Sequence, residues 1–255
     1  MRLIDTHSHI YLDDYKDDRK LVIKRALINK VNAILLPNID STSIDKLINL
    51  SKQFPDVCYP MMGLHPTSVK SDFEKELEIV ESWLNKEKFY AIGETGIDLY
   101  WDKKYIKEQL ISFERHINLA KKYNLPIVIH SRESFNEIFE VLERNGTKEL
   151  KGVLHSFSGS LSQAEQVIKL GFKLGIGGIV TFKNSGLDKT LEQISPEHLV
   201  LETDSPFLSP VPFRGKRNEP SYIEYIGMKL ATIYRMSFES IVDITSKNAT
   251  LLFNI

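Results

Sequence analysis

Residues 126–156 of the chain have the sequence PIVIHSRESFNEIFEVLERNGTKELKGVLHS, and the fold prediction rests on this stretch. A short run of β-branched residues, 127–130, precedes a longer segment, 134–144, whose apolar residues recur at intervals of three and four. A second short apolar run follows at 152–155. The order strand, helix, strand is the repeating unit of a parallel sheet that is covered by helices.

The same alternation continues in both directions along the chain. Eight runs have the composition of strands: 2–6, 33–37, 58–63, 90–94, 127–130, 152–155, 173–176 and 199–203. Helical periodicity is clear at 19–30, 43–53, 73–85, 105–123 and 134–144, and again after a loop over 206–220, at 221–234 and at 238–253, which Ser237 would cap. We therefore predict an α/β fold, a (β/α)8 TIM barrel that forms a single domain over residues 1–255.

Composition excludes several classes of protein. The 255 residues include 33 Lys and Arg against 34 Asp and Glu, so the chain has no overall positive charge to bind nucleic acid non-specifically. Cys58 is the only cysteine, which excludes an internal disulfide and a multi-cysteine zinc site and fits a reducing compartment. The sequence has no signal-peptide core and no apolar stretch near the ~20 residues of a membrane span. We expect a cytoplasmic monomer that does not contact a membrane.

The first predicted strand ends in Thr-His7-Ser-His9. Residues two apart on a strand point to the same face, so the two imidazoles should converge. Asp5 shares that face and could accept the second N–H of one imidazole, as carboxylates near metal-ligating histidines often do. An isolated pair of this kind is equally well explained by ordinary polar side chains at a strand end.

Further ligand types stand at the ends of four other predicted strands. Glu94 ends the fourth strand, His130 the fifth and His155 the sixth, and Asp204 follows the eighth. A barrel brings the carboxyl ends of its strands to one rim, where barrel enzymes build their sites. Four imidazoles and two carboxylates exceed the three protein ligands of one catalytic zinc, so we predict two divalent ions bridged by Glu94. The mixed nitrogen and oxygen ligands suit Zn, Mn, Co or Fe better than Mg, but the sequence leaves Mg, Mn, Zn and Co open.

Such a centre predicts hydrolysis by an activated water. Two ions lower the pKa of a shared water and hold the attacking and leaving oxygens of a phosphodiester. Asp204 would bind one ion and accept the proton of the water, and His65 would contact the scissile phosphate or donate a proton to the leaving group. Arg132 and Arg214 could each bind phosphate oxygens in bidentate fashion.

Other polar and aromatic residues have less certain roles. Tyr11, Tyr100 and Trp101 could stack on bases or simply pack against their loops. Lys216 and Arg217 could bind phosphate or be solvated. His116 lies within a predicted helix and His198 at the opposite end of the barrel, so we expect both to be structural or solvated.

Seven motifs along nearly the whole chain resemble those of the TatD-type metal-dependent deoxyribonucleases, in the amidohydrolase-like barrel superfamily. They are IDTHSH (4–9), GLHP (63–66), IGETGID (92–98), PIVIHSR (126–132), HSFSG (155–159), ETDSP (202–206) and RGKRNEP (214–220). The resemblance implies a (β/α)8 barrel, DNA as the substrate, 3′ exonuclease action and a part in DNA repair or degradation. It also implies a divalent-metal site made by His7, His9, Glu94, His130, His155 and Asp204. The sequence departs from the family at Tyr11, where an acidic residue or Asn is usual, and at Ser134 and Asn136, which puts substrate preference in doubt.

Two alternatives remain. A related barrel hydrolase could cleave an amide, a lactone, a phosphotriester or a D-aminoacyl-tRNA, but many such enzymes bridge their metals with a modified lysine on the fourth strand, where this chain has Glu94. A metal-stabilised scaffold without activity is disfavoured, because structural sites are closed cages of four ligands.

Overall fold

The computed structural model describes residues 2–255 and contains eight strands in two parallel sheets. One sheet has the order β1-β2-β3 and the other β4-β5-β6-β7-β8. The strands are β1 Leu3–Asp5, β2 Val31–Leu36, β3 Cys58–Pro60, β4 Ile92–Asp98, β5 Ile127–Arg132, β6 Gly152–Leu154, β7 Lys173–Ile176 and β8 Leu199–Leu201. Every predicted strand is present.

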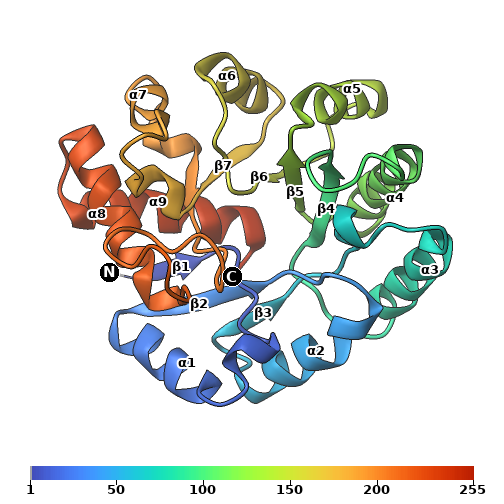
Figure 1. Ribbon diagram of the computed structural model, residues 1–255, viewed down its shortest axis with the longest axis horizontal. Helices are drawn as coiled ribbons and strands as arrows, with labels where there is room; N and C mark the ends of the chain where they lie inside the picture. The colour runs from blue at the N-terminus through green and yellow to red at the C-terminus, as the bar shows by residue number, and fades with distance from the viewer. Residues whose placement is uncertain (1) are drawn as a thin grey trace.

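Backbone hydrogen bonds join the two sheets at both gaps. A parallel bridge between Met62 and Ile92 connects β3 with β4. At the other gap, the amide of Thr6 donates to the carbonyl of Leu201 at 3.0 Å, and a bridge pairs Ser8 with Ser205. The strands therefore form a ring with the helices outside it (Figure 1). This arrangement confirms the predicted (β/α)8 barrel.

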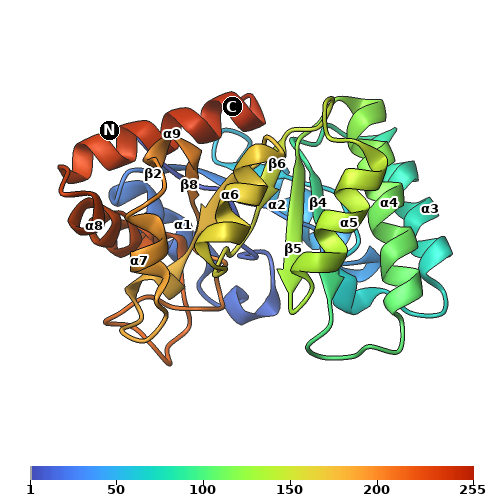
Figure 2. The same ribbon diagram turned by 90° about the horizontal axis from the view of Figure 1, so that it is seen from above.

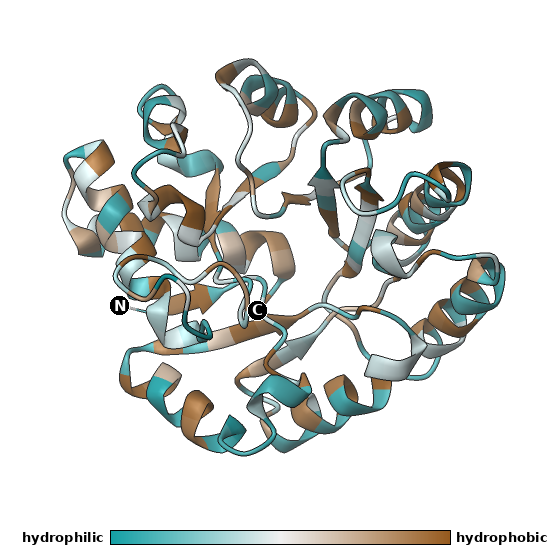
Figure 3. Ribbon diagram, viewed as in Figure 1, coloured by the Kyte–Doolittle hydropathy of each residue, from teal (hydrophilic) through white to brown (hydrophobic). Residues whose placement is uncertain are grey.

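Helices alternate with the strands, and most of them mix apolar and polar residues along their length (Figure 3). They are α1 Arg19–Ile28, α2 Ile44–Gln53, α3 Phe73–Leu84, α4 Ile106–Tyr123, α5 Phe135–Asn145, α6 Leu161–Lys169, α7 Leu187–Leu191, α8 Ile223–Tyr234 and α9 Phe238–Phe253. Their buried residues are mainly apolar, although α1 also exposes Leu21 and Ile28. Ser237 caps α9 by accepting from the amide of Ser240, as predicted. Among residues 2–255, no helix combines the length and the apolar character needed to cross a bilayer.

Helix α9 covers the amino-terminal end of the barrel (Figure 2). Ala249, Leu252 and Phe253 pack against apolar side chains inside the ring, among them Ile4 and Val128. Truncating a buried phenylalanine of this kind costs roughly 3–5 kcal/mol of stability. Because this end is sealed, only the carboxyl ends of the strands can form an accessible site.

Strand β4 differs most from its prediction, because it continues to Asp98 rather than ending at Glu94. Thr95–Asp98 pair with β5 after an irregularity in register, and Gly96 lies opposite His130. A Cβ atom on Gly96 would lie 2.1 Å from the carbonyl oxygen of His130, and its φ of +137° is unfavourable for other residues. Glycine at this position lets β4 and β5 approach closely beside the site.

Candidate metal centre

The six predicted ligands meet at the carboxyl-terminal rim of the barrel. His7 and His9 follow β1, Glu94 lies in β4, and His130 lies in β5. His155 comes directly after β6. Asp204 lies in the segment that follows β8, two residues beyond Glu202. Glu94 is 2% exposed, and histidines surround its carboxylate.

Glu94 contacts the histidines with both of its carboxylate oxygens. Its Oε2 lies 3.0 Å from Nε2 of His7 and 3.5 Å from Nε2 of His9. Its Oε1 lies 2.9 Å from Nδ1 of His130 and 3.0 Å from Nε2 of His155. Each oxygen thus faces a different pair of imidazoles, which is the arrangement of a carboxylate that bridges two ions.

Asp204 lies on the side of the first pair. Its Oδ1 is 3.8 Å from Nε2 of His7 and 3.7 Å from Nε2 of His9. Among residues 2–255, three groups of side chains have ligand atoms within 4.8 Å of one another: His7, His9 and Glu94; His7, His155 and Asp204; and His65, Glu94 and His130. This set of nitrogen and oxygen donors fits divalent transition-metal ions.

A tyrosine holds the outer nitrogen of His9. The hydroxyl of Tyr11 lies 3.0 Å from His9 Nδ1 and donates to the carbonyl of Pro37 at 2.6 Å. Since that proton is committed to Pro37, the oxygen accepts the Nδ1–H of His9 and leaves Nε2 with a free lone pair. Tyr11 is fully buried, so the suggestion that it stacks on bases is wrong.

Carboxylates hold the outer nitrogens of two other ligands. Nε2 of His130 lies 3.0 Å from Asp98, and Nδ1 of His155 lies 3.2 Å from Glu202. Both imidazoles therefore turn their other nitrogen toward Glu94, and that nitrogen can ligate an ion once the ion has displaced its proton. Neither Asp98 nor Glu202 was predicted to have a role. The available signal was that both acidic residues fall within the motifs IGETGID and ETDSP, at even spacing from a predicted ligand.

Asp5 does not hold an imidazole, contrary to the prediction. Its carboxylate accepts from the amide and hydroxyl of Thr203 at 2.9 and 2.6 Å, and from the backbone amide of His7 at 3.3 Å. Burial raises the pKa of Asp5 to about 8. Asp5 therefore fixes the backbone of His7 to the segment that carries Asp204. Nδ1 of His7 is buried without a hydrogen-bond partner among residues 2–255.

His65 lies in the same cluster, but its hydrogen-bonding role differs from that of the predicted ligands. Its Nδ1 accepts from the backbone amide of Thr67 at 3.1 Å and lies 2.7 Å from the Thr67 hydroxyl. Burial lowers the pKa of His65, so the neutral ring carries its one proton on Nε2, 3.3 Å from Oε1 of Glu94. His65 is therefore built as a hydrogen-bond donor, whereas His9, His130 and His155 have their outer nitrogens held by Tyr11, Asp98 and Glu202 and turn the other nitrogen inward as a potential ligand.

His116 supports the segment that carries His65. It is buried in α4, where its Nδ1–H donates to the carbonyl of Ser112 at 2.7 Å and its Nε2 accepts from the amide of Leu64 at 3.0 Å. Burial lowers the pKa of His116 to about 4, which keeps the ring neutral. His198, in the short helix Pro196–His198, lies at the opposite end of the barrel.

Electrostatics prepare the cluster to take up cations. Burial opposes ionisation of Glu94, but the positive charges that His65, His155 and His7 carry at the acid pH where Glu94 titrates outweigh it and hold its pKa well below its usual value. Burial lowers the pKa of His7 to about 4, so that this ring is neutral. Burial raises the pKa of Asp204 to about 6. Burial also opposes the charge of His155, but Glu94 and Glu202 raise its pKa well above the usual value, so an ion must displace that proton.

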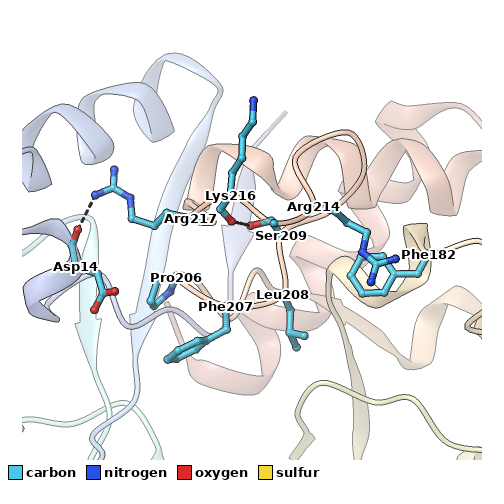
Figure 4. Close-up of a pocket in the computed structure, with 10 residues that line it drawn as sticks. Asp14, Phe182, Pro206, Phe207, Leu208, Ser209, Arg214, Lys216 and Arg217 are labelled. Atoms are coloured by element: carbon cyan, nitrogen blue, oxygen red, sulfur yellow. Dashed lines mark hydrogen bonds between the residues drawn. The ribbon is translucent and has the colours of Figure 1, made fainter.

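The predicted phosphate-binding residues lie outside this cluster. The guanidinium of Arg132 lies 3.8 Å from the ring centroid of Tyr100 and 5.3 Å from that of Trp101, and both rings are at least half exposed. Arg214 lies 4.2 Å from the ring centroid of Phe182, beside an open hollow (Figure 4). Arg217 is paired with Asp18 at 2.7 Å and is not free to bind phosphate. The structure does not bring these residues into contact with Glu94.

Comparisons with known proteins agree with this geometry. The family model of TatD related DNase matches residues 4–254. The metal-dependent hydrolase YabD of Bacillus subtilis (strain 168) is 39% identical over 99% of each chain. The metal-dependent hydrolase YjjV of Escherichia coli (strain K12) is 30% identical, and its crystal structure superimposes with a TM-score of 0.94, covering 100% of this chain and 98% of that one.

A more distant structure supports the fold alone. The hydrolase TatD family protein from Entamoeba histolytica has a TM-score of 0.86 at 22% identity and covers 99% of this chain and 98% of its own. The matched family model spans nearly the whole chain, and the two bacterial relatives, which are named as metal-dependent hydrolases, align with it over 99% and 98% of their own lengths. The chain therefore belongs to the TatD-related family of metal-dependent hydrolases.

Proposed function

We propose that the protein hydrolyses the phosphodiester bonds of DNA with the help of two divalent ions. The observation that carries this proposal is the position of Glu94, whose two oxygens face different histidine pairs. His7, His9, Glu94 and Asp204 would hold one ion, and Glu94, His130 and His155 the other. When bound, ions such as Mn²⁺, Zn²⁺, Co²⁺ or Mg²⁺ lower the pKa of a water and neutralise charge on a phosphodiester.

In this proposal, Asp204 and His65 carry out the proton transfers of the reaction. Asp204, whose pKa burial raises to about 6, accepts the proton of the attacking water as a general base near neutral pH. His65 presents Nε2–H to the same space and donates to the departing oxygen. Thr67 supports this role because it binds Nδ1 of the ring and keeps the remaining proton on Nε2.

The rim around the centre supports a nucleic-acid substrate. Arg132 and Arg214 are each stacked on an aromatic ring and present guanidinium groups that suit phosphate oxygens. Tyr100 and Trp101 are 50% and 69% exposed, and exposed rings of this kind stack on the bases of single strands. We further propose that the chain acts as one domain and as a monomer, and that it shortens DNA from the 3′ end.

The test is a cleavage assay with metal-stripped protein and end-labelled DNA, single-stranded and duplex, with Mg²⁺, Mn²⁺, Co²⁺ or Zn²⁺ added in turn. We expect metal-dependent stepwise shortening from the 3′ end that is lost in Glu94→Ala. Glu87→Ala is the matched control, because Glu87 pairs with Lys52 outside the cluster. Cleavage that persists in Glu94→Ala would reveal a contaminant. No cleavage with any of these ions would refute the nuclease and direct the search to other esters and amides.

A further inference from the structure

A hollow of about 480 Å³ opens beside the metal centre, in the loop that follows β8. Figure 4 shows Arg214 over the ring of Phe182 on one side of it, and Arg217 beside Asp14 on the other. Phe207 lies between the hollow and the ligands, because its ring centroid is 6.1 Å from that of His9. A molecule that fills the hollow and contacts Phe207 therefore lies next to the predicted metal ligands.

Phe207 is exposed but firmly held. Its side chain is 51% exposed, whereas its backbone is fixed at both ends. Its amide donates to the carbonyl of Asp204 at 2.8 Å, and its carbonyl accepts from the side-chain amide of Asn218 at 2.7 Å. Asn218 is fully buried and also binds the carbonyl of Thr203 at 2.8 Å. These hydrogen bonds hold the apolar ring of Phe207 in a fixed place beside the predicted metal ligands. A large apolar side chain would otherwise be expected to be buried.

The side of the hollow that carries Phe182 supplies a positive charge without an ion-pair partner in the described part of the chain. Arg214 lies over Phe182 and has no carboxylate partner among residues 2–255. Arg217, across the hollow, is already satisfied by the backbone carbonyl of Asp14 and by Asp18. An exposed ring together with one free guanidinium matches a flat heterocycle that is joined to a phosphate.

Resting on the proposed nuclease function, we infer that the hollow binds the nucleobase of the nucleotide on the 5′ side of the scissile phosphodiester. The base stacks on Phe207, and Arg214 contacts the phosphate on the far side of that nucleotide. The hollow is of the size of small-ligand sites. The hydroxyl of Ser209 is bonded to the carbonyl of Lys216, so this hydroxyl is not available to a base. We therefore expect stacking on Phe207 to contribute more to binding than hydrogen bonds to the base.

The experiment compares two single-stranded oligonucleotides of the same length, one with thymine and one with an abasic tetrahydrofuran unit at the nucleotide on the 5′ side of the scissile bond. Their binding to the metal-stripped protein is measured by fluorescence anisotropy, so that nothing is cleaved, and their KM is measured with metal. For the wild type we expect tighter binding of the thymine oligonucleotide by about 5- to 150-fold, the range that corresponds to the ~1–3 kcal/mol of one stacked base.

Phe207→Ala should remove this difference and leave the abasic oligonucleotide unaffected, and Phe207→Trp should restore it. Val211→Ala is the matched control, because Val211 is a 45% exposed apolar residue of the same loop that does not line the hollow. Equal losses for both oligonucleotides in Phe207→Ala, or no loss, would overturn the inference. If binding depends on the base and on Phe207 but no DNA is cleaved, the inference about the hollow stands and the proposed nuclease is refuted. The two failures are therefore distinguishable.

Discussion

Replacing Tyr11 with phenylalanine tests the proposal that Tyr11 orients His9 to bind metal. The change removes one hydroxyl and keeps the buried ring, so the packing around it is preserved. The hydroxyl accepts from His9 Nδ1 at 3.0 Å and donates to the carbonyl of Pro37 at 2.6 Å. Without it, the imidazole of His9 can rotate or change tautomer, and the lone pair on Nε2 is no longer assured.

Two magnitudes follow from these contacts. Loss of a group that orients a ligating histidine lowers metal affinity by about 10- to 100-fold. The buried N–H of His9 and the buried carbonyl of Pro37 also lose their partner, and each such loss costs about 1–3 kcal/mol of stability. We therefore expect Tyr11→Phe to weaken both metal binding and the metal-free fold.

Competition with a chromogenic chelator for Zn²⁺ measures the affinity, and urea denaturation measures the stability. Tyr15→Phe is the matched control, since Tyr15 is equally buried and its hydroxyl donates to the carbonyl of Asn218 rather than to a histidine. Tyr15→Phe should lower stability and leave the affinity for Zn²⁺ unchanged. Wild-type affinity in Tyr11→Phe would refute the orienting role.

The remaining predictions concern protons and packing. His65→Gln should keep its full metal content and lose about 10²–10⁴-fold in turnover, because His65 donates a proton and does not bind metal. Loss of an ion from this variant, measured by atomic emission, would show that His65 is a metal ligand. Asp204→Asn should reduce turnover by a similar or larger factor and yet stabilise the metal-free protein at pH 8. The pKa of Asp204 is raised to about 6 from 3.8, so its stabilising contribution is complete below pH 3.8 and is lost as the pH rises through 6. The asparagine cannot ionise and would recover up to roughly 3 kcal/mol in urea denaturation, and equal stability of both proteins at pH 8 would contradict this cause. Gly96→Ala should cost about 1–3 kcal/mol or more, because the new Cβ would lie 2.1 Å from the carbonyl oxygen of His130; an unchanged melting temperature would contradict that contact.

The sequence predicted the strands and the six clustered residues because both depend on regular geometry. Alternation along a strand and the shared rim of a barrel bring His7, Glu94 and Asp204 together whatever the loops do. The eight strands were found for the same reason, with errors only at their ends. Strand β4 was ended too early because its continuation to Asp98 depends on how Gly96 lets β5 approach.

The surroundings of the ligands could not be predicted in this way. Tyr11 lies beyond the end of β1, where the turn of the chain rather than strand alternation directs the ring inward to Pro37. Asp5 was assigned to an imidazole but binds Thr203, a residue 198 positions away. The carboxylate that does hold His155 is Glu202, which comes from a different strand of the ring. Such contacts are set by tertiary packing, and local spacing does not identify which imidazole a carboxylate contacts.

The most direct test of the account is the number of divalent ions that the metal-stripped protein must take up before it cleaves single-stranded DNA. Zn²⁺ or Mn²⁺ is added in fractions of an equivalent, and the initial rate of cleavage is followed together with bound metal. The position of Glu94 between two histidine pairs predicts that the rate rises until two equivalents are bound and that Glu94→Ala never reaches this level. Full activity at one equivalent, or cleavage that survives a chelator, would contradict the proposed centre.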